Sequence, residues 1–228
     1  MIIDSIDNIE GICIAIGRPD SRQKQQHIGF LFMDEDLEIK FLHLAWHFDL
    51  RKESPNKKYL WLDIPLDNLN KIHLATVCAS IFRSSQDRSP IPYGICIDGT
   101  SFSKDGNFIS HEKHGGLTCA TFVIQVFHSQ DYPIIDFENW EYREEDRNWQ
   151  IKILSILKGH IDSDYLNAQY KKCEESIFRF KPEEVAAAET LPSPPHGLKA
   201  LEKPAQQILD SIIEHTEKMA INEANVAR

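Results

Sequence analysis

Alternating apolar and polar positions divide the first half of the chain into short predicted strands. Residues 10–17 (EGICIAIG) form a mostly apolar run that indicates a buried strand. Residues 37–46 (LEIKFLHLAW) alternate between apolar and polar side chains, which is the period of a strand with one buried face. Because HIGFLF at residues 27–32 precedes this strand across a short acidic turn, the two segments predict a hairpin. Another short strand is expected at residues 59–64.

Helical spacing of apolar residues follows in the middle and second half of the chain. Residues 65–82 carry apolar side chains three and four positions apart, which predicts a helix. Residues 118–129 predict a second helix with an apolar stripe on one side. Residues 149–158 and 162–178 predict two more helices. Residues 93–98 (YGICID), between the first and second predicted helices, predict a strand.

The composition changes after residue 180. Residues 181–204 contain five prolines and almost no large apolar side chain other than leucine, which is typical of a linker. Residues 205–228 then place Ile208, Ile212 and other apolar side chains on one face of an expected helix. The pattern divides the chain into a domain at residues 1–180, a proline-rich linker and a C-terminal amphipathic helix. That helix either packs back on the domain or contacts a partner or a second copy of the chain.

Charge and hydropathy exclude two classes of partner. The 228-residue chain has a formal net charge of -10 and no basic stripe, so binding to nucleic acid, which needs Lys and Arg against phosphates, is not expected. The most apolar run, residues 117–127, is too short to span a bilayer. The N-terminal segment has no basic stretch ahead of an apolar one, so a secretory signal is not expected either.

Cysteine usage indicates a reducing compartment, with the cytoplasm as the default location. The chain has an odd number of cysteines, widely spaced and without a CxxC pair, which argues against a disulfide framework and against a thiolate zinc site. No metal or organic cofactor is expected. The five cysteines are Cys13, Cys78, Cys96, Cys119 and Cys173.

Cys119 is the candidate nucleophile. It follows Gly115 and Gly116 and stands at the start of a predicted helix. The positive end of the helix dipole and the unpaired N–H groups there favour a thiolate, which is the reactive form. The same N–H groups can stabilise the oxyanion of a tetrahedral intermediate. The alternative is that Cys119 is a small buried residue of the core.

Two histidines are placed to act as its base and the partner of that base. His27 opens the first strand of the hairpin and His43 lies near the end of the second, each eight residues from Glu35. If the turn is centred on Glu35, the two side chains face each other on one side of the sheet. One imidazole can then orient the other, as a cysteine nucleophile requires of its base. The alternative is a pair of structural or surface histidines.

Other polar residues are weaker candidates. His47 or Asp49 could replace His43 as the orienting group if the turn shifted. His111 and His114 have an HxxH spacing, but a glycine-rich loop is a poor platform for a metal, so solvated histidines are the better interpretation.

These motifs resemble the circularly permuted branch of the NlpC-type papain-like superfamily, which includes the lecithin:retinol acyltransferase-like proteins. The resemblance rests on HIGFLF, the acidic turn, EIKFLHLAW and, much later, LTCATFVIQVF, with histidine before cysteine. It covers roughly residues 10–130 and implies an α+β fold with a central antiparallel sheet packed against helices. It also implies that Cys119 forms an acyl-thioester, that His27 is its base and that His43 orients the base.

Two residues depart from the acyltransferase pattern and favour amide hydrolysis. Thr118 stands where the acyltransferases have asparagine, and Gly29 in HIGF matches the peptidase-like members more closely. The resemblance therefore implies a cysteine peptidase or amidase acting on a peptide, amide or acyl ester. An imidazolium partner would hold the pKa of the Cys119 thiol below the ordinary value of about 8.5. The alternatives are a lipid-directed acyltransferase or phospholipase with the same residues, and a catalytically inactive binding module with this fold.

Overall fold

The centre of the molecule is a five-stranded antiparallel sheet with the strand order β4-β3-β2-β1-β5. A computed structural model describes residues 2–19 and 25–226. The strands of the sheet are β1 (Ile12–Gly17), β2 (His27–Met33), β3 (Ile39–Trp46), β4 (Asp49–Glu53) and β5 (Tyr59–Leu62). A separate hairpin consists of β6 (Thr100–Phe102) and β7 (Phe108–Ser110).

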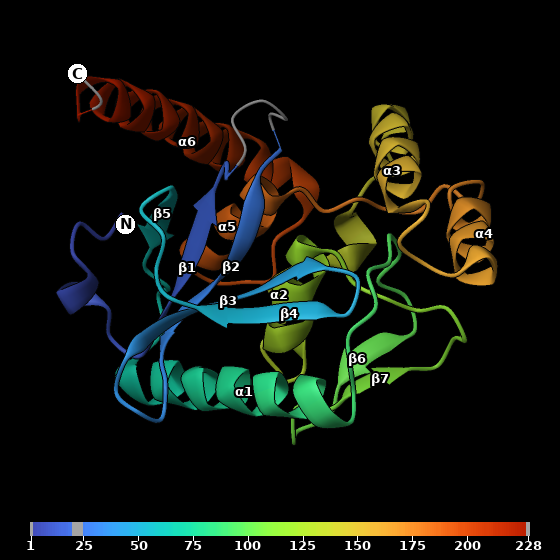
Figure 1. Cartoon of the computed structure of the whole chain (residues 1–228), viewed down its shortest axis with the longest axis horizontal. Helices are drawn as coiled ribbons and strands as arrows, with labels where there is room; N and C mark the ends of the chain where they lie inside the picture. Colours follow the sequence, from blue (N-terminus) through green and yellow to red (C-terminus); the bar gives the residue numbers. More distant parts are fainter. Residues whose placement is uncertain (1, 20–24, 227–228) are drawn as a thin grey trace.

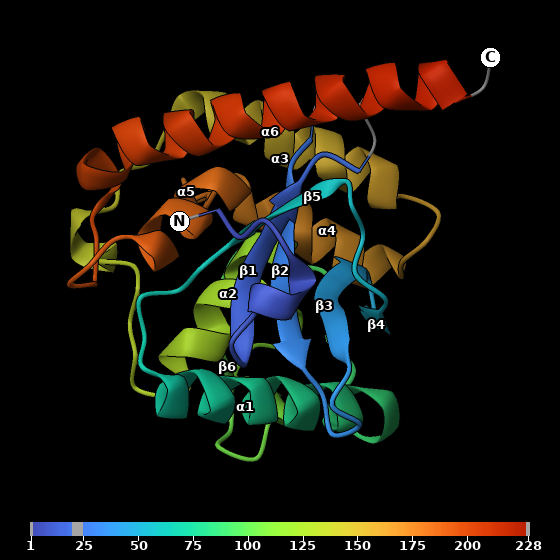
Figure 2. The same cartoon turned by 90° about the vertical axis from the view of Figure 1, so that its left-hand side faces the viewer.

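Helices enclose the sheet on several sides. Helix α1 runs across one end of the strands and α6 across the other (Figure 2), while α3 and α4 stand to one side of the sheet (Figure 1). The fold is therefore of the α+β class. The described residues contain six α-helices and two short 3-10 helices: α1 (Asn68–Asp87), α2 (Cys119–His128), α3 (Glu144–Leu157), α4 (Ser163–Lys172), α5 (Pro182–Thr190), α6 (Leu198–Val226), η1 (Ile6–Asn8) and η2 (Phe137–Asn139).

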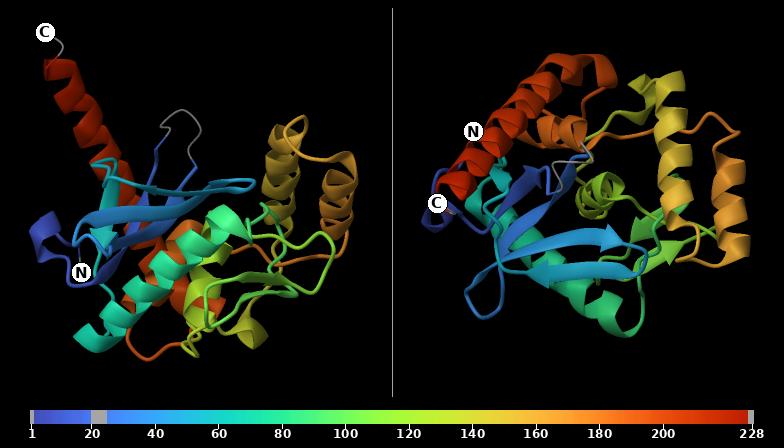
Figure 3. Two further views of the ribbon diagram at one scale, coloured as in Figure 1. Left: turned by 60° about the horizontal axis from the view of Figure 1, so that its bottom comes forward. Right: turned by 45° about the horizontal axis from the view of Figure 1, so that its top comes forward.

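The core between the sheet and α2 is aromatic and fully buried. Ile28, Phe30 and Phe32 of β2 alternate with residues of the opposite face, and all three belong to the same apolar cluster as α2. The ring centroid of Phe30 lies 6.2 Å from that of Phe122 and 5.7 Å from that of Phe127. Because α2 packs along β2 and β3 (Figure 3), the first residues of the helix are held beside the sheet.

Residues 181–204 do not form the predicted linker. Helix α5 and the start of α6 together occupy most of this segment. Val185 and the three alanines that follow it are buried in α5, which packs against β1, α2 and α6. Pro182 stands in the first helical turn, where a proline costs no hydrogen bond. Small side chains allow a helix to pack closely, so the scarcity of large apolar residues did not mean that the segment lies outside the core. Helix α6 extends the packing, since Leu201 and Ile212 are buried.

Two further elements differ from the prediction. Residues 93–98 do not form a strand: Tyr93 makes a single bridge to Leu117, and the nearby Pro90 and Pro92 have no N–H group for a ladder. The edge strand β4, which the sequence pattern did not predict, pairs with β3 and places Arg51 opposite His43.

Candidate active site

Cys119 is the first residue of α2, and a capping box holds this helix end in place. The Thr118 Oγ1 accepts a hydrogen bond from the Thr121 N–H at 3.1 Å, and the Thr121 Oγ1 accepts one from the Thr118 N–H at 2.7 Å. The N–H groups of Cys119 and Ala120 at this helix end act to lower the pKa of the thiol and so favour its ionised form. The helix end therefore supplies two donors beside the sulfur.

The glycine pair before the helix is required by close backbone packing. A Cβ atom on Gly116 would lie 2.5 Å from the Tyr165 Oη and 2.7 Å from the Pro92 carbonyl oxygen. A Cβ atom on Gly115 would lie 2.1 Å from the Ser110 Oγ. The pair lets the chain pass between these groups and enter α2 at Cys119.

The Cys119 thiol is buried and neutral rather than activated by the helix. Its residue is 7% exposed, and burial raises the pKa of the thiol from 9.0 to about 11. The N–H groups of Ile28, Ala120 and Cys119 and the charge of Arg179 act in the opposite direction without overcoming burial. The prediction of a thiol pKa below about 8.5 is therefore wrong for this structure. It relied on an imidazolium partner and left out the loss of solvent around the thiol.

The structure brings His27 and His43 together, as predicted, and adds a carboxylate. The His27 Nε2 lies 2.8 Å from the His43 Nδ1, and the His43 Nε2 lies 2.7 Å from the Glu53 Oε1 (β4). A carboxylate only accepts hydrogen bonds, so the His43 Nε2 carries the proton of that contact. A neutral His43 then accepts at Nδ1, and His27 donates from Nε2. The lone pair of His27 is left on Nδ1, which is the atom that can act as a base.

The two imidazoles are diagonal neighbours rather than directly opposite residues. The β2–β3 register pairs Phe30 with Leu42 and Met33 with Ile39, so the turn is centred on Asp36 and not on Glu35 as predicted. Continuing this register sets Gly29 opposite His43. A Cβ atom on Gly29 would lie 2.7 Å from the His43 Cβ and 2.4 Å from the Leu42 carbonyl oxygen. Glycine at this position gives His43 room to reach His27.

Aromatic rings cover the histidine pair and keep it neutral. The Phe41 ring stacks on the His43 ring at a centroid distance of 4.3 Å and an interplanar angle of 15°. The Tyr59 ring contacts Phe41 and lies 6.3 Å from the His27 ring. Burial lowers the pKa of His27 to about 3, and it also lowers the pKa of His43, although Glu53 acts to raise the latter. Both imidazoles are therefore free bases at neutral pH.

Cys119 lies beside the backbone at the start of β2, at the residue next to His27 in the chain. The thiol faces the N–H of Ile28, the residue after His27, and its charged form would also act on Tyr59 beside the His27 ring. The described residues contain no hydrogen bond between the Cys119 Sγ and His27. The thiol itself opens into a cavity of about 80 Å³. The side chains that surround it are mainly polar or aromatic, and they include Gln25, Gln26, Tyr93, Trp149, Lys152 and Arg179.

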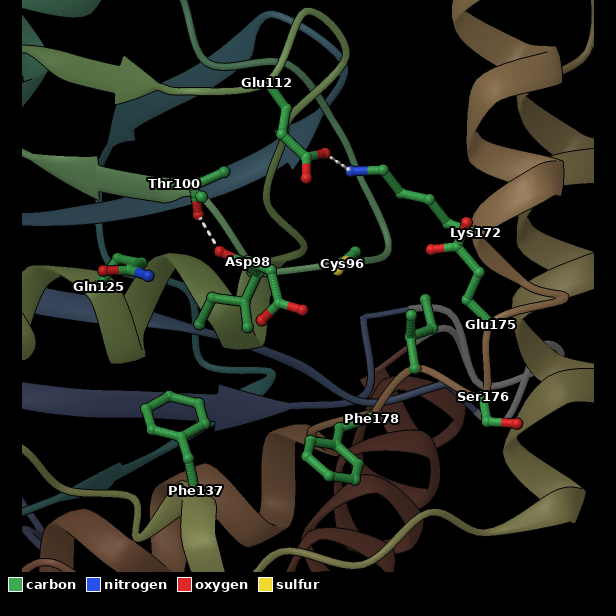
Figure 4. A pocket seen from close by; sticks show the side chains of 13 residues that line it. Cys96, Asp98, Thr100, Glu112, Gln125, Phe137, Lys172, Glu175, Ser176 and Phe178 are labelled. Carbon is green, nitrogen blue, oxygen red and sulfur yellow. Dashed lines mark hydrogen bonds and ion pairs between the residues drawn. The ribbon is translucent and has the colours of Figure 1, made fainter.

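Cys96 offers a comparison within the same molecule. It is also 7% exposed, and burial raises the pKa of its thiol to about 11 as well. It lines a different cavity of about 440 Å³ (Figure 4), where Asp98, Glu112 and Glu175 are the acidic side chains and Lys172 pairs with Glu112. No histidine is among the described lining residues of this cavity or of the cavity beside Cys119, and the two differ in charge, because Lys152 and Arg179 line the latter and no acidic residue does. Cys96 therefore matches Cys119 in burial and differs from it in chemical surroundings.

The alternative orienting residues have other partners. The His47 Nδ1 accepts a hydrogen bond from the Tyr93 N–H at 3.1 Å, and Asp49 accepts one from the Arg51 Nε at 3.0 Å. His111 and His114 are not part of a metal-binding group: the described part of the chain contains no cluster of three or more His, Cys, Asp or Glu side chains that could hold a metal ion.

Sequence reasoning missed Glu53 and Arg179. DLRKE has a single apolar residue, Leu50, and no apolar–polar period, so no sequence signal indicated the edge strand that places Glu53 on the same face as His43. Arg179 lies between two predicted elements, and no spacing pattern connects it with Cys119.

Comparisons with models of known protein families, with curated proteins and with solved structures find no match to this chain. No helix within residues 2–19 and 25–226 is long and apolar enough to cross a membrane.

Proposed function

We propose that this protein is a cysteine-nucleophile hydrolase of the amidase or peptidase type with a permuted papain-like fold. The observation that carries the proposal is the hydrogen-bonded series from Glu53 through His43 to His27, which leaves the base lone pair on the His27 Nδ1. The order of histidine before cysteine along the chain and the packing of α2 on β2 and β3 support the permuted arrangement. The five cysteines are free thiols, which fits a cytoplasmic location.

The proposed reaction begins from a neutral thiol and a neutral imidazole. The Cys119 Sγ attacks the carbonyl carbon of an amide or ester while its proton passes to the His27 Nδ1. The N–H groups of Cys119 and Ala120 stabilise the oxyanion of the tetrahedral intermediate. The C–N or C–O bond breaks as His27 returns the proton to the leaving group, and an acyl-thioester remains. Water then attacks the thioester with His27 as base, which releases the acid and restores the thiol.

His43 and Glu53 act in this scheme as positioning residues. Their hydrogen bonds fix the tautomer of His27 and hold its ring, as the partner of a catalytic histidine does in other nucleophilic sites. His43 is largely buried, whereas the Glu53 side chain is 51% exposed. Protonated His27 would be stabilised by the carboxylate through the intervening imidazole during the reaction.

The cavity favours hydrolysis of a small polar substrate over transfer of a fatty acyl chain. About 80 Å³ beside Cys119, walled by Gln25, Gln26 and charged side chains, does not match a long hydrocarbon. An apolar groove of about 500 Å³ lies elsewhere, lined by Met33, Leu37 and other residues between the hairpin turn and α1, and Cys119 is not among them. A lipid-directed acyltransferase would need such a groove at the thiol.

The test is acylation by p-nitrophenyl acetate followed by mass spectrometry of the cysteine peptides. Cys119 should be acetylated and then deacetylated, while Cys96, with equal exposure and a similar thiol pKa, should react far more slowly. Cys119→Ser should abolish turnover and Cys96→Ser should not. His27→Ala should reduce the rate by ~10²–10⁴, the usual contribution of a general base, and His43→Gln should retain a measurable remnant.

Two results would contradict the proposal. Equal acetylation of Cys96 and Cys119 would mean that the histidines give no catalytic advantage. A stable folded protein without acetylation at Cys119 would favour the catalytically inactive binding module.

A further inference from the structure

The cavity beside Cys119 is lined by positive charge alone. Lys152 and Arg179 are its charged residues, and none of the lining residues described there is acidic. The chain as a whole has 35 acidic residues and 25 basic ones, so a cavity whose charged residues are all basic has the opposite charge to the whole chain. Arg179 is near enough to Cys119 to lower the pKa of its thiol.

Arg179 is held rigidly by two neighbours. Its guanidinium carbon lies 3.9 Å from the centre of the Trp149 ring, which is a cation–π contact. Its Nη1 donates a hydrogen bond to the Asp146 Oδ1 at 3.0 Å, and Asp146 is itself buried and bonded to the Arg143 Nε at 2.6 Å. The guanidinium is therefore fixed in position before any ligand arrives.

Much of the hydrogen-bonding capacity of Arg179 is unused. Its Nε is buried without a partner, and the hydrogen bonds among described residues do not use its Nη2 either. Nε and one Nη form the planar pair of donors that binds a carboxylate through two parallel hydrogen bonds. Lys152 is exposed at the same cavity and adds a second cation. Asp146 pairs with both Arg179 and Arg143, and Arg143 also pairs with Glu184, so the open Nε and Nη2 donors rather than an excess of charge distinguish Arg179.

We propose that this cavity is a carboxylate subsite, so that the substrate of Cys119 is an amide or ester with a carboxylate close to the scissile carbonyl. The inference rests on the proposed function, because it names the substrate class of the same nucleophile. A cavity of about 80 Å³ accepts a small group of this kind, with its oxygens bound by Arg179 and Lys152. The class includes acylated amino acids and peptides with a free terminal or side-chain carboxylate.

Two alkylating reagents that differ only in charge test the subsite directly. Iodoacetate and iodoacetamide present the same carbon to the thiol, and each reaction forms an S–C bond and releases iodide. Peptide mapping gives both rate constants at Cys119 and at Cys96, and N-acetylcysteine supplies the intrinsic ratio. The iodoacetate-to-iodoacetamide ratio should be at least tenfold higher at Cys119 than for N-acetylcysteine. It should be lower than the intrinsic ratio at Cys96, beside Asp98 and Glu175 (Figure 4).

The variants separate the subsite from general effects of charge. Arg179→Gln and Lys152→Gln should each lower the ratio at Cys119, while Lys171→Gln, an exposed lysine outside the cavity, should not. Arg179→Gln also removes a partner of the buried Asp146 and could fail to fold. The Lys152→Gln variant tests the subsite without that risk. In the wild-type chain, succinate should protect Cys119 from iodoacetamide, and its neutral diamide should not.

The outcomes distinguish the two proposals. If the ratio at Cys119 equals that of N-acetylcysteine while p-nitrophenyl acetate still acylates Cys119, the carboxylate subsite is overturned and the hydrolase stands. If neither alkylating reagent reaches Cys119 and acylation also fails, the hydrolase and its subsite are overturned together.

Discussion

Burial dominates the ionisation of Cys119, and the pH profile of its alkylation is the measurement that tests this. A thiol pKa of about 11 in place of 9.0 lowers the thiolate population at neutral pH about 100-fold. A more basic thiolate is also more nucleophilic, with a Brønsted slope of about 0.4–0.5, so its intrinsic rate constant is roughly eightfold higher. Cys119 should therefore react with iodoacetamide about tenfold more slowly than an unburied cysteine at pH 7.

The assay is the rate of carbamidomethylation of each cysteine peptide between pH 6 and 10. The rate at Cys119 should rise about tenfold for each pH unit up to pH 9 without a plateau, because its pKa lies above this range. Cys96 should give a profile of the same shape, since its burial and thiol pKa are similar. Cys78, which is completely buried, should not react in the folded protein.

The His27→Ala variant distinguishes a cysteine that is already ionised in the resting site from one that loses its proton to His27 only during the reaction. A neutral imidazole adds no charge to the resting site, so this variant should leave the alkylation profile of Cys119 nearly unchanged while its acylation by p-nitrophenyl acetate falls. A plateau below pH 8 in the wild-type chain, lost in His27→Ala, would refute the reasoning. It would mean that a thiolate–imidazolium pair forms before substrate binds.

Two further predictions concern stability. Ile212→Ala should lower the free energy of unfolding by about 2–5 kcal/mol in urea denaturation, because this α6 side chain is 1% exposed. Ile221→Ala on the same helix, 61% exposed, should change it by less than about 0.5 kcal/mol, and equal effects would mean that α6 is not part of the core. Glu189 is buried without partners in the described structure, and burial raises its pKa well above 4.5, so it stays protonated after the unfolded chain has ionised. Stability should therefore fall by up to about 1.4 kcal/mol per pH unit as pH rises above 4.5, until the folded pKa is reached, and Glu189→Gln should flatten that slope; parallel slopes would contradict this assignment.

The histidine pair was predictable because a strand has a period of two. The predicted turn centre was wrong by one residue, which shifts the pairing between β2 and β3 by two. A shift of two keeps every side chain on its face, whereas a shift of one would have moved His43 to the opposite side. His27 and His43 thus became diagonal instead of direct neighbours, and Gly29 left the space for their contact.

Properties that depend on the whole fold were not predictable in this way. The helix start at Cys119 follows from local sequence, but its pKa depends on how completely the sheet and the segment around Arg179 remove solvent. Helix α5 looked like a linker because its alanines are small, although small residues suit a tightly packed helix. Glu53 belongs to a short charged strand whose existence depends on pairing with β3.

A neutral thiol and a cationic cavity are mutually consistent features of the proposed site. A preformed thiolate would repel a substrate carboxylate held close by, and the repulsion would be strong in a buried site because the effective dielectric constant there is low. A neutral Cys119 avoids this repulsion while Arg179 and Lys152 bind the carboxylate. The negative charge on sulfur then needs to develop only as the S–C bond forms, when the proton moves to His27. That order of events requires an unprotonated base before substrate binds, and burial keeps His27 unprotonated while its hydrogen bond to His43 fixes its tautomer. The same burial makes the resting imidazole a weaker proton acceptor, so the scheme depends on His43 and Glu53 to stabilise the protonated form of His27 as the S–C bond forms.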